Sequence, residues 1–151
     1  MLIYFIIATL IVLADFTTKA IVLSHLSLGQ SIEVSSFFNL VYVLNKGVSF
    51  SMLSNTGPVL LTVLATLISL SVVYFMFKEK DSFSRTALAL ILGGAVGNII
   101  DRVRYGAVVD FLDFHAFGYH WPAFNIADSA ICIGVTLLLY QMIFIKKEEN
   151  K

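Results

Sequence analysis

Four ionisable residues gather at the ends of apolar segments in the C-terminal half of the sequence. Asp101 and Arg102 close one such segment, Asp110 follows, and Asp128 opens the last apolar segment. Ionisable groups are costly inside a membrane, so those that are kept there are candidates for function. Two carboxylates that share a proton have separated pKa values, so one can activate water while the other protonates a carbonyl oxygen. The pattern predicts hydrolysis by paired acids, as in aspartic proteases, at one face of a membrane.

Other chemistries find less support in the residues. His25, His115 and His120 lack the spacing of zinc ligands, and Cys132 lies in an apolar segment without a nearby base. No Gly-x-Ser-x-Gly motif is present. We therefore expect no metal and no cofactor. A small transporter or proton-relay protein is the main alternative, although a relay would space its acids through the depth of the bilayer. A noncatalytic subunit, whose polar residues only join helices, is a third reading.

Each acid also has a simpler interpretation. Asp128 falls in a first helical turn, where a carboxylate is favoured by the helix dipole. Asp110 is either an ordinary interfacial charge or, among its apolar neighbours, a carboxylate that needs a partner. Asp101 lies next to Arg102 and on the same helix face as Asn98, which favours a structural role.

The elements that must position these residues are membrane helices. Of 151 residues, 58% are hydrophobic and only 13% are charged, whereas a soluble domain carries roughly a quarter charged residues. A helix needs ~20 apolar residues to cross a bilayer. The sequence predicts one domain, residues 1–151, with spans at about 2–23, 58–77, 86–101 and 127–145. Within the first span, Asp15 and Lys19 are four residues apart and can neutralise each other. We therefore expect structural roles for Asp15 and, as argued above, for Asp101.

The charges between the spans predict the orientation. Basic residues follow the second and fourth spans, at Lys78, Lys80, Arg85 and in the KKEENK tail, and basic flanks prefer the cytoplasm. Both termini are then cytoplasmic, and residues 24–57 and 102–126 lie outside. The first outer segment is rich in strand-forming residues and predicts a strand pair within 31–53, while the second is crowded with aromatic residues that suit the membrane interface. The fold class is therefore all-α and membrane-embedded, with four transmembrane helices and a small β-rich extracytoplasmic segment.

The net charge gives no electrostatic reason for a nucleic-acid partner, because ten basic and ten acidic side chains cancel. Apolar partners and membrane lipids fit the composition better.

Several sequence blocks resemble the bacterial lipoprotein signal peptidases, also called signal peptidase II. They are GGAVGNIIDR (93–102), VVDF (108–111), PAFNIADS (122–129), Asp15 with the TTK that ends at Lys19, and Asn45 with Gly47. The resemblance extends over the whole chain.

This resemblance implies a four-helix aspartic endopeptidase of the bacterial inner membrane, with its active site at the extracytoplasmic face. Its substrates would be prolipoproteins, cut just before a cysteine that carries diacylglycerol. By motif, Asp110 and Asp128 would be the catalytic pair. The residues expected to bind substrate or support the site are Asn45, Asn98, Arg102 and Asn125. We expect a monomer.

Overall fold

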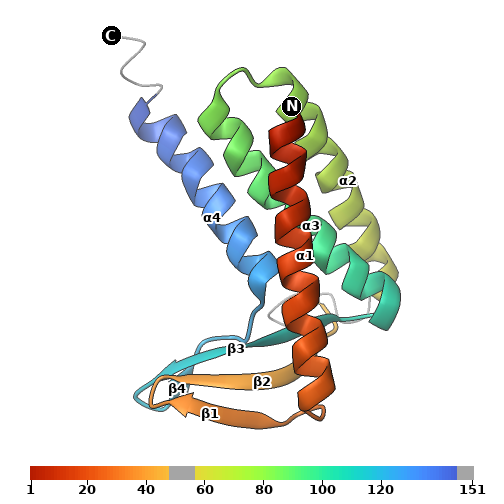
Figure 1. The fold of residues 1–151 in the computed structure, drawn as a ribbon, viewed down its shortest axis with the longest axis vertical. Helices are drawn as coiled ribbons and strands as arrows, with labels where there is room; N and C mark the ends of the chain where they lie inside the picture. The colour runs from red at the N-terminus through yellow and green to blue at the C-terminus, as the bar shows by residue number, and fades with distance from the viewer. Residues whose placement is uncertain (48–56, 146–151) are drawn as a thin grey trace.

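The computed structural model describes residues 1–47 and 57–145. The helices are α1 (Leu2–His25), α2 (Gly57–Lys78), α3 (Ser82–Tyr105) and α4 (Ile126–Tyr140), which continues as a short π-helix, η1 (Gln141–Ile145). The strands are β1 (Ser31–Ser35), β2 (Phe38–Asn45), β3 (Val108–Ala116) and β4 (Tyr119–His120). The helices form a bundle, and the strands form a sheet that lies across one end of it (Figure 1).

All four helices are long and apolar enough to cross a membrane. They also expose large apolar side chains such as Leu10, Leu67 and Leu139, which are 58%, 56% and 48% exposed. Soluble proteins rarely present such continuous apolar surfaces to water, whereas lipid accommodates them. The predicted architecture of four membrane helices with a small sheet is thus confirmed. The structure extends the third helix beyond the predicted span 86–101 at both ends.

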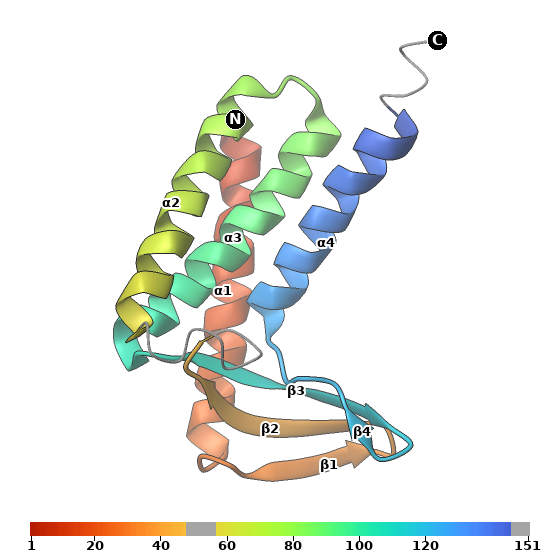
Figure 2. The ribbon, with the colours of Figure 1, turned by 180° about the vertical axis from the view of Figure 1, so that it is seen from behind.

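Helix α3 is the centre of the bundle and packs against α1, α2 and α4 (Figure 2). In its span 56% of the residues are buried, compared with 17% to 22% in the other three. Glycines permit this packing: a Cβ at Gly93 would lie 2.7 Å from the Ala8 carbonyl oxygen of α1, and one at Gly94 would lie 2.3 Å from the Ala127 carbonyl oxygen of α4. Gly93 and Gly97 also have the small-xxx-small spacing that lets helix backbones approach closely in a membrane.

The ends of α3 are defined by side-chain and glycine caps. Asp81 caps its start by accepting a hydrogen bond from the Ser84 backbone N–H at 2.7 Å, which holds the pKa of this carboxyl below its usual value. The Gln141 amide donates to the same carboxylate at 2.7 Å and accepts from the Ser84 hydroxyl, so η1 is tied to the start of α3. At the other end Gly106 adopts φ 67°, a left-handed conformation that turns the chain into β3.

The sheet has the order β1-β2-β3-β4, and all its pairs are antiparallel. Between β2 and β3, Val43 pairs with Asp110 and Asn45 pairs with Val108. This register brings the end of β2 next to the VVDF block. The predicted strand pair is found over residues 31–45, and positions 48–53 of that prediction lie outside the described residues.

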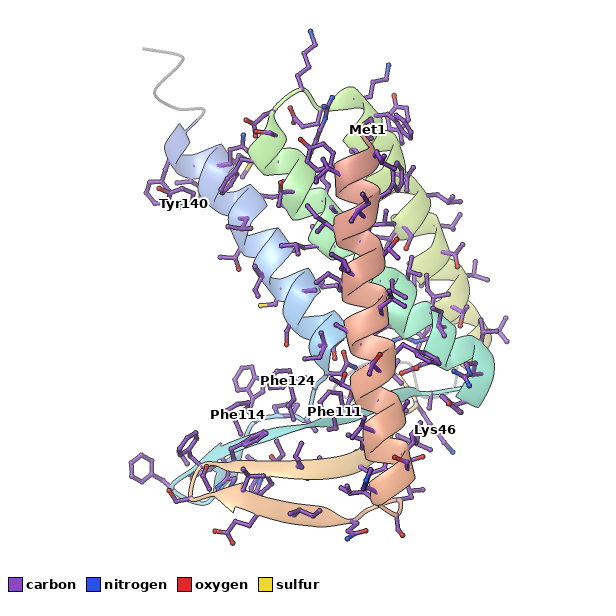
Figure 3. All side chains as sticks on the ribbon, viewed as in Figure 1. Met1, Lys46, Phe111, Phe114, Phe124 and Tyr140 are labelled. Atoms are coloured by element: carbon purple, nitrogen blue, oxygen red, sulfur yellow. The ribbon has the colours of Figure 1, made fainter. Side chains whose placement is uncertain are left out.

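The aromatic segment after α3 forms β3 and β4, which the sequence analysis did not predict. Its aromatic side chains remain largely exposed at the far end of this hairpin, where Phe117, Tyr119 and Trp121 are 100%, 83% and 70% exposed. Phe114 stacks on Phe124 with 5.8 Å between ring centroids, and both lie at the sheet end of the molecule (Figure 3). Their contact with a membrane interface stays a prediction.

The described parts of the two segments that were predicted to lie outside, residues 24–47 and 102–126, share one end of the bundle. Figure 3 shows Met1 and Tyr140 at the end opposite to Phe111 and Phe124, and Figure 1 shows the α2–α3 turn on the same side as the N-terminus. The segments share an end because the chain crosses the bundle twice between them, through α2 and α3. The candidate site lies at this end, where α3, β3 and α4 meet.

Candidate active site

Asp110 lies on β3 and is 2% exposed. Its Oδ2 atom accepts a hydrogen bond from the Asn45 amide at 3.0 Å, and its Oδ1 atom accepts one from the Asn125 amide at 2.7 Å. Burial raises the pKa of Asp110 to about 6, and the negative charge of Asp128 acts in the same direction, while the two amide hydrogen bonds oppose it. This carboxyl can therefore hold or release a proton near neutral pH.

Asp128 lies in the first turn of α4 and is partly exposed. The Asn98 amide of α3 donates to its Oδ1 atom at 2.7 Å. The N-cap of α4 is Asn125, not Asp128, so the carboxylate of Asp128 can be directed to contacts outside its own helix. The two predicted catalytic acids thus differ in setting, one buried and one open to the surroundings.

Asn125 connects the two acids and is completely buried, with 0% exposure. Its Oδ1 atom accepts the backbone N–H of Asp128 at 2.8 Å, while its amide donates to the Asp110 carboxylate at 2.7 Å. One side chain therefore caps α4 and binds the carboxylate on β3. The structure brings Asn45, Asn125, Asp110 and Asp128 together, and their roles in catalysis stay a prediction.

Lys19 reaches the same cluster from α1, although the sequence analysis treated it only as the neighbour of Asp15. Its amine is 3% exposed and donates to the Asn98 Oδ1 atom at 3.3 Å. A lysine inside an apolar span indicates that its charge has a partner, and this pattern could have marked Lys19 as a candidate. The sequence does not show which other helix the lysine contacts.

The two acids read as structural, Asp15 and Asp101, are both buried and both bind Lys19, at 2.7 and 2.8 Å. Asp15 also accepts the Ala127 backbone N–H at 2.9 Å, and Asp101 accepts the Val109 backbone N–H at 3.0 Å. The ion pair of Asp101 is therefore formed with Lys19 of α1, and not with its sequence neighbour.

Arg102 lies four residues after Asn98 on α3, half-buried at the edge of the cluster. Its guanidinium interacts electrostatically with Asp128, Asp110 and Asp101. The same side chain lines a cavity of about 260 Å³ whose other walls come largely from α2. It is thus placed between the acids and the surface of α2.

A second cavity, of about 350 Å³, adjoins Asp128. Its lining is mainly apolar and aromatic and consists of Trp121, Phe124, Asp128, Ser129, Cys132 and Ile133. Apolar walls beside a carboxylate suit a ligand that has both an apolar part and a polar part.

A separate polar cluster lies further along β3. Asp113 accepts hydrogen bonds from Asn39 and His120, each at 2.9 Å, and His120 stacks on His115. Although burial acts to raise it, the pKa of Asp113 is held below its usual value by these two donors. Among residues 1–47 and 57–145, no three His, Cys, Asp or Glu side chains form a group that could hold a metal ion.

Known proteins similar to this chain agree with the resemblance. The family model described as signal peptidase (SPase) II matches residues 7–144. The lipoprotein signal peptidase of Syntrophotalea carbinolica is 48% identical, over 88% of this chain and 86% of its own. That of Janthinobacterium sp. (strain Marseille) is 51% identical, over 89% of this chain and 84% of its own.

The fold is also shared with solved structures. A structure described as a bacterial membrane enzyme superposes with a TM-score of 0.85 at 37% identity, and the match covers 98% of this chain and 90% of the other. A second structure with the same description also gives 0.85, at 36% identity over 94% and 93% of the two chains. The resemblance drawn from the sequence motifs is confirmed, and this multi-pass membrane protein belongs to the signal peptidase II family of peptidases.

Proposed function

We propose that this chain is an aspartic endopeptidase that removes the signal peptide from diacylglyceryl-modified prolipoproteins by cutting before the lipidated cysteine. Asp110 and Asp128 are its catalytic residues. The observation that carries the proposal is the double role of Asn125, which holds the Asp110 carboxylate and the backbone of Asp128 with one buried amide.

The pair holds one proton between its two carboxyls. Asp110 is the more buried acid and the favoured carrier of this proton, since its pKa is raised to about 6. Asp128 takes a proton from water as the water oxygen attacks the scissile carbonyl carbon, and Asp110 gives its proton to the carbonyl oxygen. Asp128 then passes its proton to the amide nitrogen, and Asp110 recovers a proton from a hydroxyl of the tetrahedral intermediate as the C–N bond breaks, which leaves a carboxylic acid and an amine.

The remaining polar residues position the peptide. Asn45 orients the Asp110 carboxylate, Asn98 orients that of Asp128, and Arg102 places a positive charge beside the developing negative oxygen. The acyl chains of the substrate stay in lipid beside the helices, and the apolar cavity next to Asp128 accepts neighbouring apolar groups.

The proposed setting follows from the charge distribution. Lys78, Lys80 and Arg85 flank the turn between α2 and α3, so this end faces the cytoplasm, together with both termini. The sheet and the acids then lie at the extracytoplasmic face of the inner membrane, where exported prolipoproteins are available. The chain acts as a monomer with a single peptidase domain, residues 1–151.

A cleavage assay with reconstituted protein and a diacylglyceryl-modified precursor tests this proposal. Wild type should release the signal peptide, and Asp110→Asn and Asp128→Asn should each lose at least a thousandfold in kcat while remaining folded. Asp113→Asn is a matched control, because this acid lies on the same strand in a separate cluster, and it should keep kcat within a few-fold. Activity retained in either Asp110→Asn or Asp128→Asn contradicts the assignment.

The same vesicles separate this function from that of a transporter. Ion or proton flux that disappears in Asp128→Asn, without precursor cleavage by wild type, would favour the relay reading. If Asp110→Asn and Asp128→Asn reduce the amount of assembled protein but the assembled fraction keeps its turnover of the precursor, the acids only join helices, as in a noncatalytic subunit.

A further inference from the structure

Two backbone amides that precede the proposed catalytic acids are held by buried carboxylates. The Val109 N–H, next to Asp110 in the chain, donates to Asp101 at 3.0 Å. The Ala127 N–H, next to Asp128, donates to Asp15 at 2.9 Å. The position of each catalytic residue along its own element is thus set by a hydrogen bond to a carboxylate on another helix.

Lys19 joins these two carboxylates. Its amine lies 2.7 Å from the Asp15 Oδ2 atom and 2.8 Å from the Asp101 Oδ2 atom, and it donates to the Asn98 Oδ1 atom at 3.3 Å. An ammonium group has three N–H donors, so these three contacts use its full capacity. Asn98 in turn donates to the Asp128 carboxylate.

From these contacts we infer that Lys19 is a positioning residue that fixes the separation of the Asp110 and Asp128 carboxylates. The inference rests on the proposed function of that pair. Through Asp101 the lysine holds β3, through Asp15 it holds the start of α4, and through Asn98 it orients the attacking base.

The burial of Lys19 distinguishes this role from simple bracing of α1. A pair spaced four residues apart on one helix can neutralise itself without a third partner. Here the amine also reaches Asp101 and Asn98 on α3, at 3% exposure, where a charge is retained only with several partners. The three contacts of Lys19, one within α1 and two with α3, and the two backbone bonds form one continuous path between the catalytic residues.

The positive charge has a second effect that can be measured. Asp110 is faced by Lys19 from α1, by Arg102 from α3 and by Asp128 from α4. The Lys19 charge acts to lower the pKa of Asp110, against burial and the charge of Asp128. Loss of this charge should therefore raise that pKa and move the alkaline limb of the pH–rate profile to higher pH.

The test replaces Lys19 and then supplies an amine. A cavity of about 310 Å³ between α1 and α3 is lined by Lys19 and Asp101, so a small alkylammonium ion can approach their place. Lys19→Ala should lose about a hundredfold in kcat with little change in KM, because misplacement by about 1 Å costs that much. Propylammonium should restore at least a tenth of the lost activity, and tetramethylammonium, which has no N–H donors, should restore none.

The controls separate positioning from folding. Lys78→Ala, at an exposed lysine far from the cluster, should keep wild-type kcat. If Lys19→Ala does not accumulate as folded protein, Lys19→Gln takes its place, since its amide can donate to Asp15 and Asp101 without charge. This variant should show a smaller kcat loss and the upward shift of the alkaline limb.

The inference is overturned if the folded fraction of either variant keeps kcat within threefold of wild type with an unshifted profile, even when less protein folds. Should wild type itself fail to cleave the precursor, the proposed function fails instead. Cleavage that needs Asp110 and Asp128 but not Lys19 leaves the function standing and removes only the positioning role.

Discussion

Replacement of Asn125 separates helix capping from support of the acid pair. Alanine removes the cap on the Asp128 N–H and the bond to the Asp110 carboxylate, together with two longer bonds of 3.3 Å to the Asn98 Oδ1 atom and the Val109 carbonyl oxygen. Serine can still cap a helix, but it is too short to reach the Asp110 carboxylate. The two variants therefore differ in the cap and share the loss of the Asp110 contact.

The expected magnitudes follow from these contacts. An N-cap contributes about 1 kcal/mol. Above about pH 6, where Asp110 is ionised, a hydrogen bond to this charged group contributes about 1.5–3 kcal/mol, and the 0% exposure of Asn125 means that no solvent replaces it. Asn125→Ser should thus lower the free energy of unfolding by about 1.5–3 kcal/mol, and Asn125→Ala by about 1 kcal/mol more. If the Asp110 contact is fully used in the transition state, kcat falls about ten- to a hundredfold in both.

The assay combines thermal unfolding in detergent micelles with cleavage of the modified precursor. Asn39→Ala is the control, because Asn39 donates to Asp113 at 2.9 Å, a similar amide–carboxylate bond away from the pair. It should affect stability but not kcat. Wild-type kcat in Asn125→Ser would mean that this side chain is only a cap, and the reasoning from its double role would be refuted.

Three further outcomes are expected. The value of kcat/KM should fall as pH rises above about 6, because ionisation of Asp110 removes the proposed catalytic acid; a flat profile between pH 5 and 8 would contradict this. Asn45→Ala removes a hydrogen bond that lowers the pKa of Asp110, so the same limb should move to higher pH, and a downward shift would count against it. Gly94→Ala places a Cβ 2.3 Å from the Ala127 carbonyl oxygen, so calorimetry should find a loss of about 1–3 kcal/mol; an unchanged Tm would disprove this tight packing.

The helices and the acid pair were within reach of sequence analysis for different reasons. Uncharged runs such as residues 58–77 have few structural alternatives other than a membrane helix, so composition alone predicts them. Asp110 and Asp128 were predicted as partners from motifs, and the structure brings both to the same amide, that of Asn125. The chemical roles of these residues remain predictions.

The contacts of Lys19 and the extent of the sheet were not predictable in the same way. A lysine in an apolar span demands a partner, but its choice of Asp101 depends on how α1 packs on α3, which spacing along one helix cannot reveal. The aromatic run that forms β3 and β4 suits an interfacial layer as well as a hairpin, since Phe, Tyr and Trp favour both. Tertiary contacts with β2 decide between them.

The cluster draws on the first helix and on the last, with Asp15 and Lys19 near one end of the chain and Asp128 near the other. A nascent polypeptide whose final crossing is still in the ribosome possesses only one of the two acids. Any proteolytic activity that needs both acids must therefore begin only after α4 has been synthesised and has packed against the other helices.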